Sequence, residues 1–541
     1  MKKNQAFEKS KTLIENGFSL LKVNNIQLAN KYINEAEKLN IKNSSLLLEL
    51  AKFFNSIKNH EKFKFNIHKA IKYSKNDNEL KLNICDFLIK INYHALAMEQ
   101  LKIIVENKSV KKNILLVAVI NLASCYVFVE KLEEAIKLYT AFKDNFCESF
   151  EFNYNFANAL SRNGKVVEAV DFYKKAHELD KNHPWPLHNL ASAYSMLGNL
   201  DHAARMYQNL ICVDPSNNEA RSALSIVHLK LGDFKQGWHN YRYRWKDNVF
   251  RNSESSQSLK YAEYFKYPEN LAELSRKRIA IICEQGIGDD IMFYSTIPDL
   301  ISCGAIITII AKSRLTSLLA NSFSNLPIKD INKIDFDTRD FDFIVPAGDL
   351  PYFFRNHAND FPKLPYLVPS NNSILSINKI YNFDRSKLNV GIAWRGGSIG
   401  TGSKYRSLDP TVMAKLVNHK DINVVSLQYG EIESEIEIIK QNIASVISPY
   451  KTDILNEIDM LAALIAELDL IITVQNSNVH ICGALGKNCI VMLPHSPEWR
   501  YGIVADQMSW YGSVELFRQT KLGDWTDVIE KVKKRLYEEL I

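Results

Sequence analysis

Residues Trp185 to Pro215 read WPLHNLASAYSMLGNLDHAARMYQNLICVDP, and this stretch decides the fold of the first half of the chain. It predicts two amphipathic helices, Trp185–Leu197 and Leu200–Val213. Gly198 between them permits the left-handed backbone of a tight turn. Ala203 on the second helix is small enough for the two helices to cross closely. The stretch therefore predicts one helical hairpin with a single apolar face.

The same hairpin recurs every 34 residues. Three turn glycines and three tyrosines share this spacing: Gly164, Gly198 and Gly232, and Tyr173, Tyr207 and Tyr241. The small-residue position continues upstream, with a slip of four residues before its last member: Ala29, Phe63, Ala97 and Ala135. The upstream turns carry other residues where glycine would stand: Asn24, Lys58 and Asn92. One hairpin cannot bury its apolar face alone, so about seven hairpins over residues 1–245 are expected to stack into a superhelix with a concave groove.

This pattern resembles the tetratricopeptide repeat, most closely in the units at 121–245. The shared features are Leu-Ala-x-Ala-Tyr-x-x-Leu-Gly after the tryptophan, Ala-x-x-x-Tyr on the second helix and the closing Asp-Pro. The groove of such an array suits the docking of a protein or peptide. A stabilising or dimerising scaffold is the alternative, because a repeat by itself does not specify a function.

From Arg278 onward, apolar runs of strand length alternate with helical patterns. The expected strands cover residues 278–283, 306–311, 341–345, 389–394, 422–427, 469–474 and 488–493. This alternation predicts parallel sheets whose faces are covered by helices. A proline-containing stretch at 350–369 separates two groups of strands, which predicts two Rossmann-like lobes at 278–385 and 386–541, after a polar linker at 246–277. Ligands in such folds bind beyond the carboxyl ends of the strands.

The first candidate stretch at a strand end is CEQGIGDDI, at residues 283–291. Gly286 and Gly288 permit a tight turn before a helix that begins near Asp289. Backbone N–H groups at the start of such a helix suit an anionic ligand. By spacing alone, an N-cap of that helix is the favoured interpretation of Asp289.

The second stretch, AWRGGSIGTGSKYRSLD, covers residues 393–409. It is a glycine-rich loop that carries Arg395, Lys404 and Arg406. Cationic side chains and backbone amides of this kind suit a diphosphate. A flexible loop with solvated charges is the alternative.

The third stretch, TVQNSNVHICGALGK, covers residues 473–487. Four polar side chains crowd the start of a helix that follows a buried strand: Gln475, Asn476, Ser477 and His480. This helix start is also suited to an anion. If a diphosphate binds here, its charge is expected to be balanced by lysine, arginine and helix dipoles, without a metal ion.

Taken together, the chain resembles tetratricopeptide proteins whose C-terminal domain is similar to the ADP-heptose:lipopolysaccharide heptosyltransferases of glycosyltransferase family nine. The matching pieces are GWHNYRYRW, EQGIGDDIMF, VGIAWRGG with KYRSLD, VSLQYG, DMLAALIAELDLIIT, VHICGALGKNCIVMLP, PEWRYG and WYGSVELFRQTKLGDW. The resemblance implies an all-α helical-repeat solenoid followed by an α/β GT-B fold. It also implies inverting, metal-independent transfer of a sugar from a nucleotide-sugar co-substrate, with no other cofactor.

The resemblance assigns roles to individual residues. Asp289 matches the family aspartate that is the general base for the acceptor hydroxyl, which is worth roughly 10²–10⁴-fold in rate. The implied donor-binding residues are Gly286, Gly288, Arg395, Lys404, Arg406, Gln428, Asn476, Ser477 and His480. Gln475 departs from the family, which usually has aspartate at that position, and this departure puts the donor and the activity in question.

Three functions remain open at this point. The repeat fusion favours a protein hydroxyl, docked by the groove, as the acceptor; this layout is similar to O-GlcNAc transferase-like enzymes and flagellin glycosyltransferases. A glycan or lipid-linked acceptor is the second option. The third is a non-catalytic adaptor whose transferase domain has degenerated, an option that Gln475 keeps open.

The bulk composition limits the partners. The net charge of +6 over 541 residues gives no case for nucleic acid, which needs a strongly basic domain. The longest apolar run, at 304–311, is far shorter than the ~20 residues of a membrane span. The N-terminus lacks the apolar stretch of a secretory signal, and the eight cysteines include no Cys-x-x-Cys pair. We therefore expect a cytoplasmic protein with reduced thiols.

Overall fold

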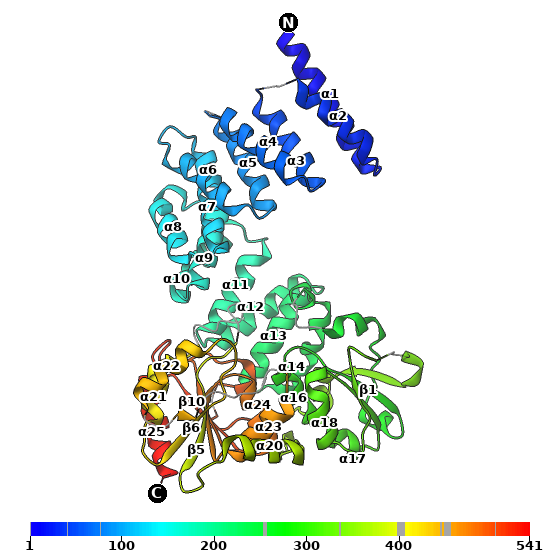
Figure 1. The fold of residues 1–541 in the computed structure, drawn as a ribbon, viewed down its shortest axis with the longest axis vertical. Helices are drawn as coiled ribbons and strands as arrows, with labels where there is room; N and C mark the ends of the chain where they lie inside the picture. The colour runs from blue at the N-terminus through cyan, green and yellow to red at the C-terminus, as the bar shows by residue number, and fades with distance from the viewer. Residues whose placement is uncertain are drawn as a thin grey trace. The chain divides into compact units, whose positions relative to one another are not determined.

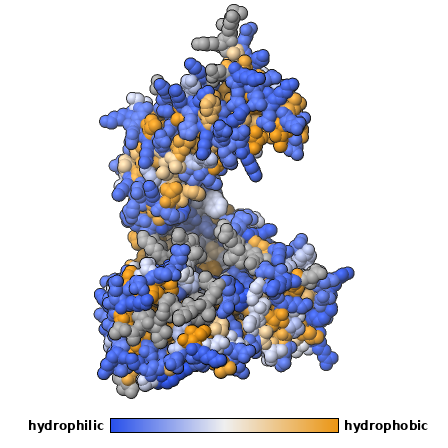
Figure 2. Space-filling view, viewed as in Figure 1, coloured by the Kyte–Doolittle hydropathy of each residue, from blue (hydrophilic) through white to orange (hydrophobic). Residues whose placement is uncertain are grey.

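The computed structural model describes residues 2–39, 42–75, 77–252, 257–334, 337–397, 406–443, 446–447, 456–503 and 505–540. These residues form two compact units, Met1–Asn189 and Leu190–Ile541. Hydrophilic side chains cover most of the face shown in Figure 2, and apolar ones lie scattered among them. No helix in the described ranges has both the length and the apolar character that crossing a bilayer requires.

The predicted helical repeats are confirmed. Seven hairpins follow one another in the described part of the chain (Figure 1). They are α1 Lys2–Lys22 with α2 Ile26–Lys38, α3 Ser44–Ser56 with α4 His60–Tyr73, α5 Asn78–Lys90 with α6 His94–Glu106, α7 Lys112–Phe128 with α8 Leu132–Phe146, α9 Phe150–Arg162 with α10 Val166–Leu179, α11 Pro184–Met196 with α12 Leu200–Val213, and α13 Asn218–Leu231 with α14 Phe234–Tyr241. The alanines that repeat along the second helices are fully buried, which explains why that position is small.

Each hairpin turns through one residue with a left-handed backbone. These residues are Asn24, Lys58, Asn92, Glu130, Gly164, Gly198 and Gly232, with φ between 57° and 85°. A non-glycine residue in this conformation costs roughly 1–2 kcal/mol, least for asparagine. The packing of the two helices therefore imposes the turn, whether or not glycine occupies it.

The four-residue slip in the repeat corresponds to a longer helix. α7 has 17 residues, whereas α5 and α9 have 13 each. Four residues add about one helical turn, because an α-helix has 3.6 residues per turn. Ala135 consequently lies on the same buried face as the other small residues and is fully buried.

The second unit contains two parallel sheets, as predicted. The first consists of β1 Arg278–Ile282, β2 Ile306–Ala311, β3 Ile328–Asp330 and β4 Phe343–Pro346, in the order β3-β2-β1-β4. The second consists of β5 Leu388–Ala393, β6 Ile422–Ser426, β7 Val446–Ile447, β8 Leu470–Val474, β9 Cys489–Leu493 and β10 Val514–Arg518, in the order β10-β9-β8-β5-β6-β7. Every pairing between these strands is parallel.

Helices cover the faces of these sheets. Those near the first sheet are α16 Ile287–Tyr294, α17 Ile297–Ser302, α18 Thr316–Ser322 and α19 Pro351–Phe354. Those near the second are α20 Asn371–Tyr381, α21 Pro410–Val417, α22 Glu433–Asn442, α23 Ile458–Glu467, α24 Ser477–Leu485 and α25 Thr526–Glu538. Ile472 of β8 packs in the core with α21, α22 and α25, whereas its neighbour Ile471 packs in the core with α23 and α24. Figure 1 shows these two groups of helices on opposite sides of the sheet.

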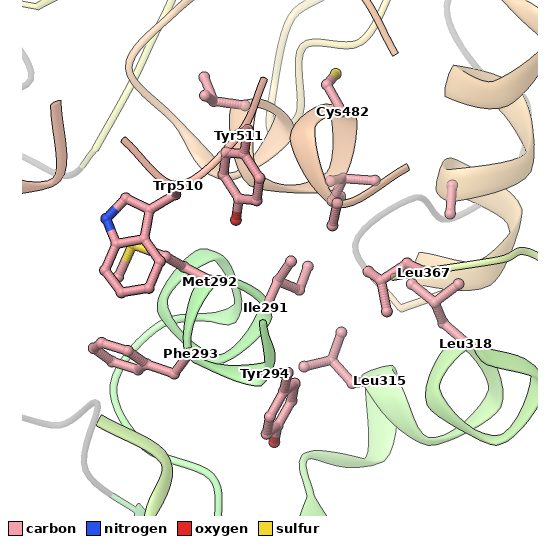
Figure 3. Close-up of a cluster of buried hydrophobic side chains, with 14 of the residues drawn as sticks. Ile291, Met292, Phe293, Tyr294, Leu315, Leu318, Leu367, Cys482, Trp510 and Tyr511 are labelled. Carbon is pink, nitrogen blue, oxygen red and sulfur yellow. The ribbon is translucent and has the colours of Figure 1, made fainter. Parts of the chain in front are cut away.

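One hydrophobic core joins the two sheets through α16. Residues 291–294 of this helix are fully buried. Figure 3 shows Met292 and Phe293 directed toward Trp510, and Leu315, Leu318 and Leu367 on another side of the helix. All of these residues belong to the same apolar cluster as α23 and α24. The second half of α16 is therefore held firmly beside the second sheet.

The segment expected as a linker, at 246–277, packs on the first sheet where it is described. It carries α15 Asn248–Arg251 and two 3₁₀ helices, Gln257–Tyr264 and Leu271–Leu274. Lys266 forms an antiparallel bridge to Ile344 of β4. The polar composition of the segment does not indicate this contact, because main-chain groups form the bridge.

The turn geometry predicts that Lys58→Gly stabilises its hairpin by about 0.5–1 kcal/mol. Glycine removes the strain of the left-handed backbone but loses more entropy on folding, so the gain is smaller than the full strain. Native-state hydrogen exchange of amides in α3 and α4 measures the opening free energy. Asn24→Gly is the matched control. Amide exchange in its own hairpin, α1 and α2, should change little, since asparagine tolerates this conformation. Equal slowing of exchange in both variants would contradict the argument.

Candidate functional site

The first and third candidate stretches meet where two helices begin. α16 follows β1, and α24 follows β8, so both helices start at carboxyl ends of strands. A Cβ atom at Gly288 would lie 2.9 Å from Cδ2 of His480 and 3.3 Å from Cα of Ser477. The lack of a side chain at Gly288 thus permits the contact between the two helix starts. The sequence predicted each helix start, and the structure places them together.

Asp289 has two partners at this junction. Its carboxylate accepts a hydrogen bond from the backbone N–H of Gly286 at 3.3 Å. The helix begins at Ile287, so Gly286 is the N-cap residue, and Asp289 caps the helix from its third position and not as the N-cap that the spacing suggested. It also forms an ion pair with Arg500, and both side chains are mostly buried. The carboxylate is therefore held toward the second sheet by a cation, in addition to capping its own helix.

Arg500 and its neighbours form a line of alternating charges. Nη1 of Arg500 lies 3.6 Å from the Glu498 carboxylate, whose other oxygen lies 3.0 Å from Nη1 of Arg406. Burial disfavours the charge on Arg500, but Asp289 and then Glu498 outweigh this effect and raise the pKa of its guanidinium. Arg500 consequently stays charged, and the line runs Asp289–Arg500–Glu498–Arg406.

His480 is buried beside this line. Its Nδ1 lies 3.3 Å from the hydroxyl of Tyr511. Burial and, second to it, the nearby charge of Arg500 lower the pKa of the His480 imidazole to about 3. The ring is therefore neutral at physiological pH, so it can exchange hydrogen bonds but does not supply positive charge to a phosphate.

Asn476 and Ser477 form the start of α24. The side-chain oxygen of Asn476 accepts the N–H of Asn478 at 3.1 Å, which makes Asn476 the cap of the helix. Its amide nitrogen donates to Thr473 Oγ1 at 3.0 Å. Ser477 is half-buried and lies against Gly288.

The second candidate stretch is described at its ends only. Lys404 lies outside the described residues, together with the rest of 398–405. Arg406 is buried against Gly397, where a Cβ atom would overlap the guanidinium. Arg395 instead pairs with Glu435 at 3.0 Å. Arg406 therefore joins the charged line, and Arg395 is engaged with α22.

Two glutamines hold the backbone around the site. The side-chain oxygen of Gln428 accepts the N–H groups of Trp394 and Arg395, at 3.0 and 2.7 Å. The side-chain oxygen of Gln475 accepts the N–H of Glu498 at 3.1 Å. Gln428 thus fixes the chain after β5, and Gln475 fixes the segment that carries the Glu498 and Arg500 side chains.

A buried ionic network lies behind the loop that carries Asp289. Arg244 donates to both oxygens of Glu284, at 2.7 and 3.0 Å, and pairs with Asp349 at 2.5 Å. Tyr267 donates its hydroxyl to Asp349 at 2.7 Å. Burial raises the pKa of the Glu284 carboxyl, against the opposing effect of Arg244. Glu284 begins the loop to α16, so this network fixes the loop.

Asp290, the residue after the candidate base, faces the opposite way. It is fully buried, accepts the N–H of Glu284 at 2.7 Å and forms an ion pair with Lys312. Burial raises the pKa of the Asp290 carboxyl to about 7, although Lys312 acts against this shift. Asp290 therefore braces the loop and leaves Asp289 as the aspartate of this pair that faces the second sheet.

Sequence reasoning assigned no role to Arg500, Glu498 or Tyr511. These residues lie within PEWRYG and WYGSV, which were noted only as matching pieces of the resemblance. A charged pair flanked by aromatic residues is a signal of a buried ionic contact, because such charges must be paired when buried. Asp289, the partner of Arg500 on α16, lies 211 positions earlier in the chain, so no local pattern indicates this pairing.

No group of three or more His, Cys, Asp or Glu side chains is arranged to hold a metal ion among the described residues. The sequence contains two Asp-x-Asp pairs, at 335–337 and 340–342. The second, Asp340 and Asp342, lies within the described residues and directly precedes β4. It therefore lies at the amino end of that strand, opposite the edge where α16 and α24 begin.

Comparison with known proteins supports the repeats directly. A family model described as the tetratricopeptide repeat matches residues 187–219. The chain is 25% identical over 446 residues to Protein FlbA of Caulobacter vibrioides, covering 77% of this chain and 72% of that protein.

Two solved structures are similar in part. PilW, a type IV pilus biogenesis factor, is 17% identical with a TM-score of 0.31, covering 40% of this chain and 98% of PilW. A tetratricopeptide repeat protein from Parabacteroides merdae is 16% identical with a TM-score of 0.33, covering 41% of this chain and 84% of that protein.

The buried imidazole predicts a pH dependence of stability. In the unfolded chain, His480 has an ordinary pKa near 6.5, and in the folded chain its pKa is about 3. Below about pH 6.5 the unfolded chain takes up a proton that the folded chain does not. The free energy of unfolding should therefore fall by up to about 1.4 kcal/mol per pH unit toward pH 3.

The check is urea denaturation at neutral and mildly acidic pH for the parent chain and His480→Gln. The variant should lose less stability on acidification, by about 1 kcal/mol per pH unit. His202→Gln, at an exposed position on α12, is the matched control. An unchanged slope in His480→Gln would show that the imidazole takes up a proton while folded.

Proposed function

We propose that this protein is an inverting, metal-independent glycosyltransferase that uses a nucleotide sugar. The observation that carries the proposal is the meeting of Asp289, at the start of α16, with the polar start of α24 and the cations Arg500 and Arg406. A carboxylate and an anion-suited helix start face each other from two sheets. A proton acceptor and a site for a leaving diphosphate are thereby within one junction.

The arrangement of the sheets supports a GT-B fold. Two separate parallel sheets meet near the carboxyl ends of β1 and β8, where ligands bind in α/β folds. The motifs shared with the family-nine heptosyltransferases fall at this junction: EQGIGDDIMF contains Asp289, and VHICGALGK lies in and just after α24.

In the proposed reaction, the acceptor hydroxyl attacks the anomeric carbon of the donor sugar. The new C–O bond forms as the bond from that carbon to the diphosphate oxygen breaks, with inversion at the carbon. The proton of the hydroxyl passes to the Asp289 carboxylate. Arg500 occupies an oxygen of the Asp289 carboxylate in the ion pair, so Arg500 would turn toward another anion when Asp289 accepts the proton.

The leaving diphosphate is the anion that Arg500 would take. It carries away the negative charge that develops in the reaction, and stabilising such charge is commonly the largest catalytic contribution. Arg406 and the N–H groups at the start of α24 would complete its site. The resemblance to the family adds Lys404, which lies outside the described residues. His480, being neutral, would contribute a hydrogen bond.

A protein hydroxyl is the acceptor that the architecture favours. Tetratricopeptide hairpins occupy the first half of the chain, and repeat arrays of this kind offer extended surfaces for peptides. A glycan or lipid-linked acceptor would not need such an array. If the array positions the acceptor, a polypeptide is the natural substrate.

A non-catalytic adaptor is the second candidate. It is favoured by Gln475, which stands where the family has a carboxylate and whose side-chain oxygen is already engaged with the backbone of Glu498. In this case the transferase fold binds no donor, and the repeats alone recruit a partner.

Donor binding separates the two candidates. Isothermal titration of the full chain with ADP-, UDP-, GDP- and CMP-sugars should detect one of them, with the same affinity in EDTA. At about 100 times its dissociation constant, that donor should add about 2.7 kcal/mol of stability. Absence of binding by all four classes would favour the adaptor.

Asp289→Asn should keep donor binding yet lose at least about 10²-fold in turnover, because it removes the base. Donor hydrolysis, or transfer to a protein acceptor once that is in hand, measures the turnover. Asp201→Asn, an exposed aspartate on α12, is the control and should turn over like the parent. Full turnover by Asp289→Asn would remove Asp289 from the mechanism.

A further inference from the structure

A long groove follows the outer side of the last hairpin helix. It consists of two open cavities, about 590 and about 720 Å³, which share His239 and Tyr352 in their walls. One wall is α14 with the 3₁₀ helix that continues it, Arg242–Lys246. The groove is separate from the Asp289 junction, since its lining includes none of the residues of that site.

The helical wall is basic. Lys235, His239, Arg242 and Lys246 line it at spacings of four, three and four residues. Residues three or four apart lie on the same side of a helix, so these side chains form a row. In the described part of the chain, no carboxylate forms an ion pair with Arg242 or Lys246, and Glu263 is the acidic residue among the lining.

The facing wall is aromatic and apolar. It contains Phe265, Tyr267, Leu271, Tyr352 and Phe353. The guanidinium of Arg242 lies between two of these rings, 4.0 Å from the centre of Tyr267 and 5.1 Å from that of Tyr352. These cation–π contacts hold the Arg242 cation in place without neutralising it.

We propose that this groove binds an acidic stretch of a partner polypeptide. The basic row attracts carboxylates, and the aromatic wall accepts the apolar side chains between them. Lys235 to Lys246 spans roughly 16 Å of helix, the length of about five extended residues. Two cavities in a row along this length suit a chain better than a compact ligand, which would occupy one of them.

Binding at the groove does not depend on sugar transfer. If the chain is a transferase, the groove selects acidic regions of the acceptor protein. If it is an adaptor, the groove recruits the partner. A binding measurement therefore tests the groove without testing the reaction.

The test is fluorescence anisotropy of the full chain with labelled peptides of about eight residues. A peptide of alternating glutamate and tyrosine should bind, and its lysine–tyrosine and serine–tyrosine counterparts should bind at least tenfold more weakly. Added salt should weaken the binding, because it screens interactions between exposed charges. Equal binding of the serine–tyrosine peptide would overturn the proposal.

Charge reversal locates the contact. Arg242→Glu with Lys246→Glu should weaken the acidic peptide at least tenfold. Lys235→Glu with Lys246→Glu leaves the stacked arginine intact and should also weaken it, which covers the case in which the first variant does not fold. Lys420→Glu with Lys534→Glu, at exposed positions of the second unit, is the matched control.

Unchanged affinity in folded groove variants would overturn the proposal. So would full displacement of the peptide by an equal concentration of inorganic phosphate, because the site would then recognise a small anion and not a polypeptide.

Discussion

The Arg244 guanidinium, buried between two carboxylates, is the contact on which the second unit depends. It ties the end of the last repeat hairpin to Glu284 at the end of β1 and to Asp349 after β4. Such a network adds little net stability compared with an apolar core, but loss of one partner leaves a buried charge and costs about 3–5 kcal/mol. Its main effect is on position. Trp238 adds a second tie through its hydrogen bond to the carbonyl of Arg355, so hairpin and sheet form one piece, and the loop that carries Asp289 starts from a fixed point.

Local patterns were enough to predict the repeat hairpins and the longer apolar strands of this fold. The 34-residue period gave the hairpins, and the apolar runs gave the longer strands, because each signal lies within a few residues. β3 and β7 were missed because two or three residues carry no periodicity, and β10 because its VELFR sequence mixes charge with apolar residues. The structure brings together the candidate residues of the first and third stretches with Arg406. Arg395 instead pairs with Glu435, and Gln428 binds the backbone after β5. Arg500 could not be predicted, since its pairing with Asp289 joins distant parts of the chain.

The junction between α16 and α24 combines tight packing of the two helices with charged side chains that share their ion-pair partners. Gly288 allows backbone-level contact, and the apolar side of α16 is locked in the shared core, so neither helix start can move freely. The charges beside them are less constrained, because Arg500 is shared between Asp289 and Glu498, and Glu498 is shared with Arg406. In the proposed function, an incoming anion would change the partners of these side chains while the backbone stays in place. This is the preorganisation that charge-stabilising sites require.

The extra turn of α7 has a consequence for how such an array can change in length. Four added residues rotate the following chain by about 40° relative to the repeat, so the apolar seam is nearly preserved. Two added residues would rotate it by about 200° and direct polar side chains into the core. Insertions and deletions within the hairpin helices are thus tolerated only when their length is close to a whole number of helical turns. Complete 34-residue repeats can be duplicated or lost on either side of α7. Length differences between homologous arrays should accordingly cluster near multiples of 34 residues, with or without an offset of about four.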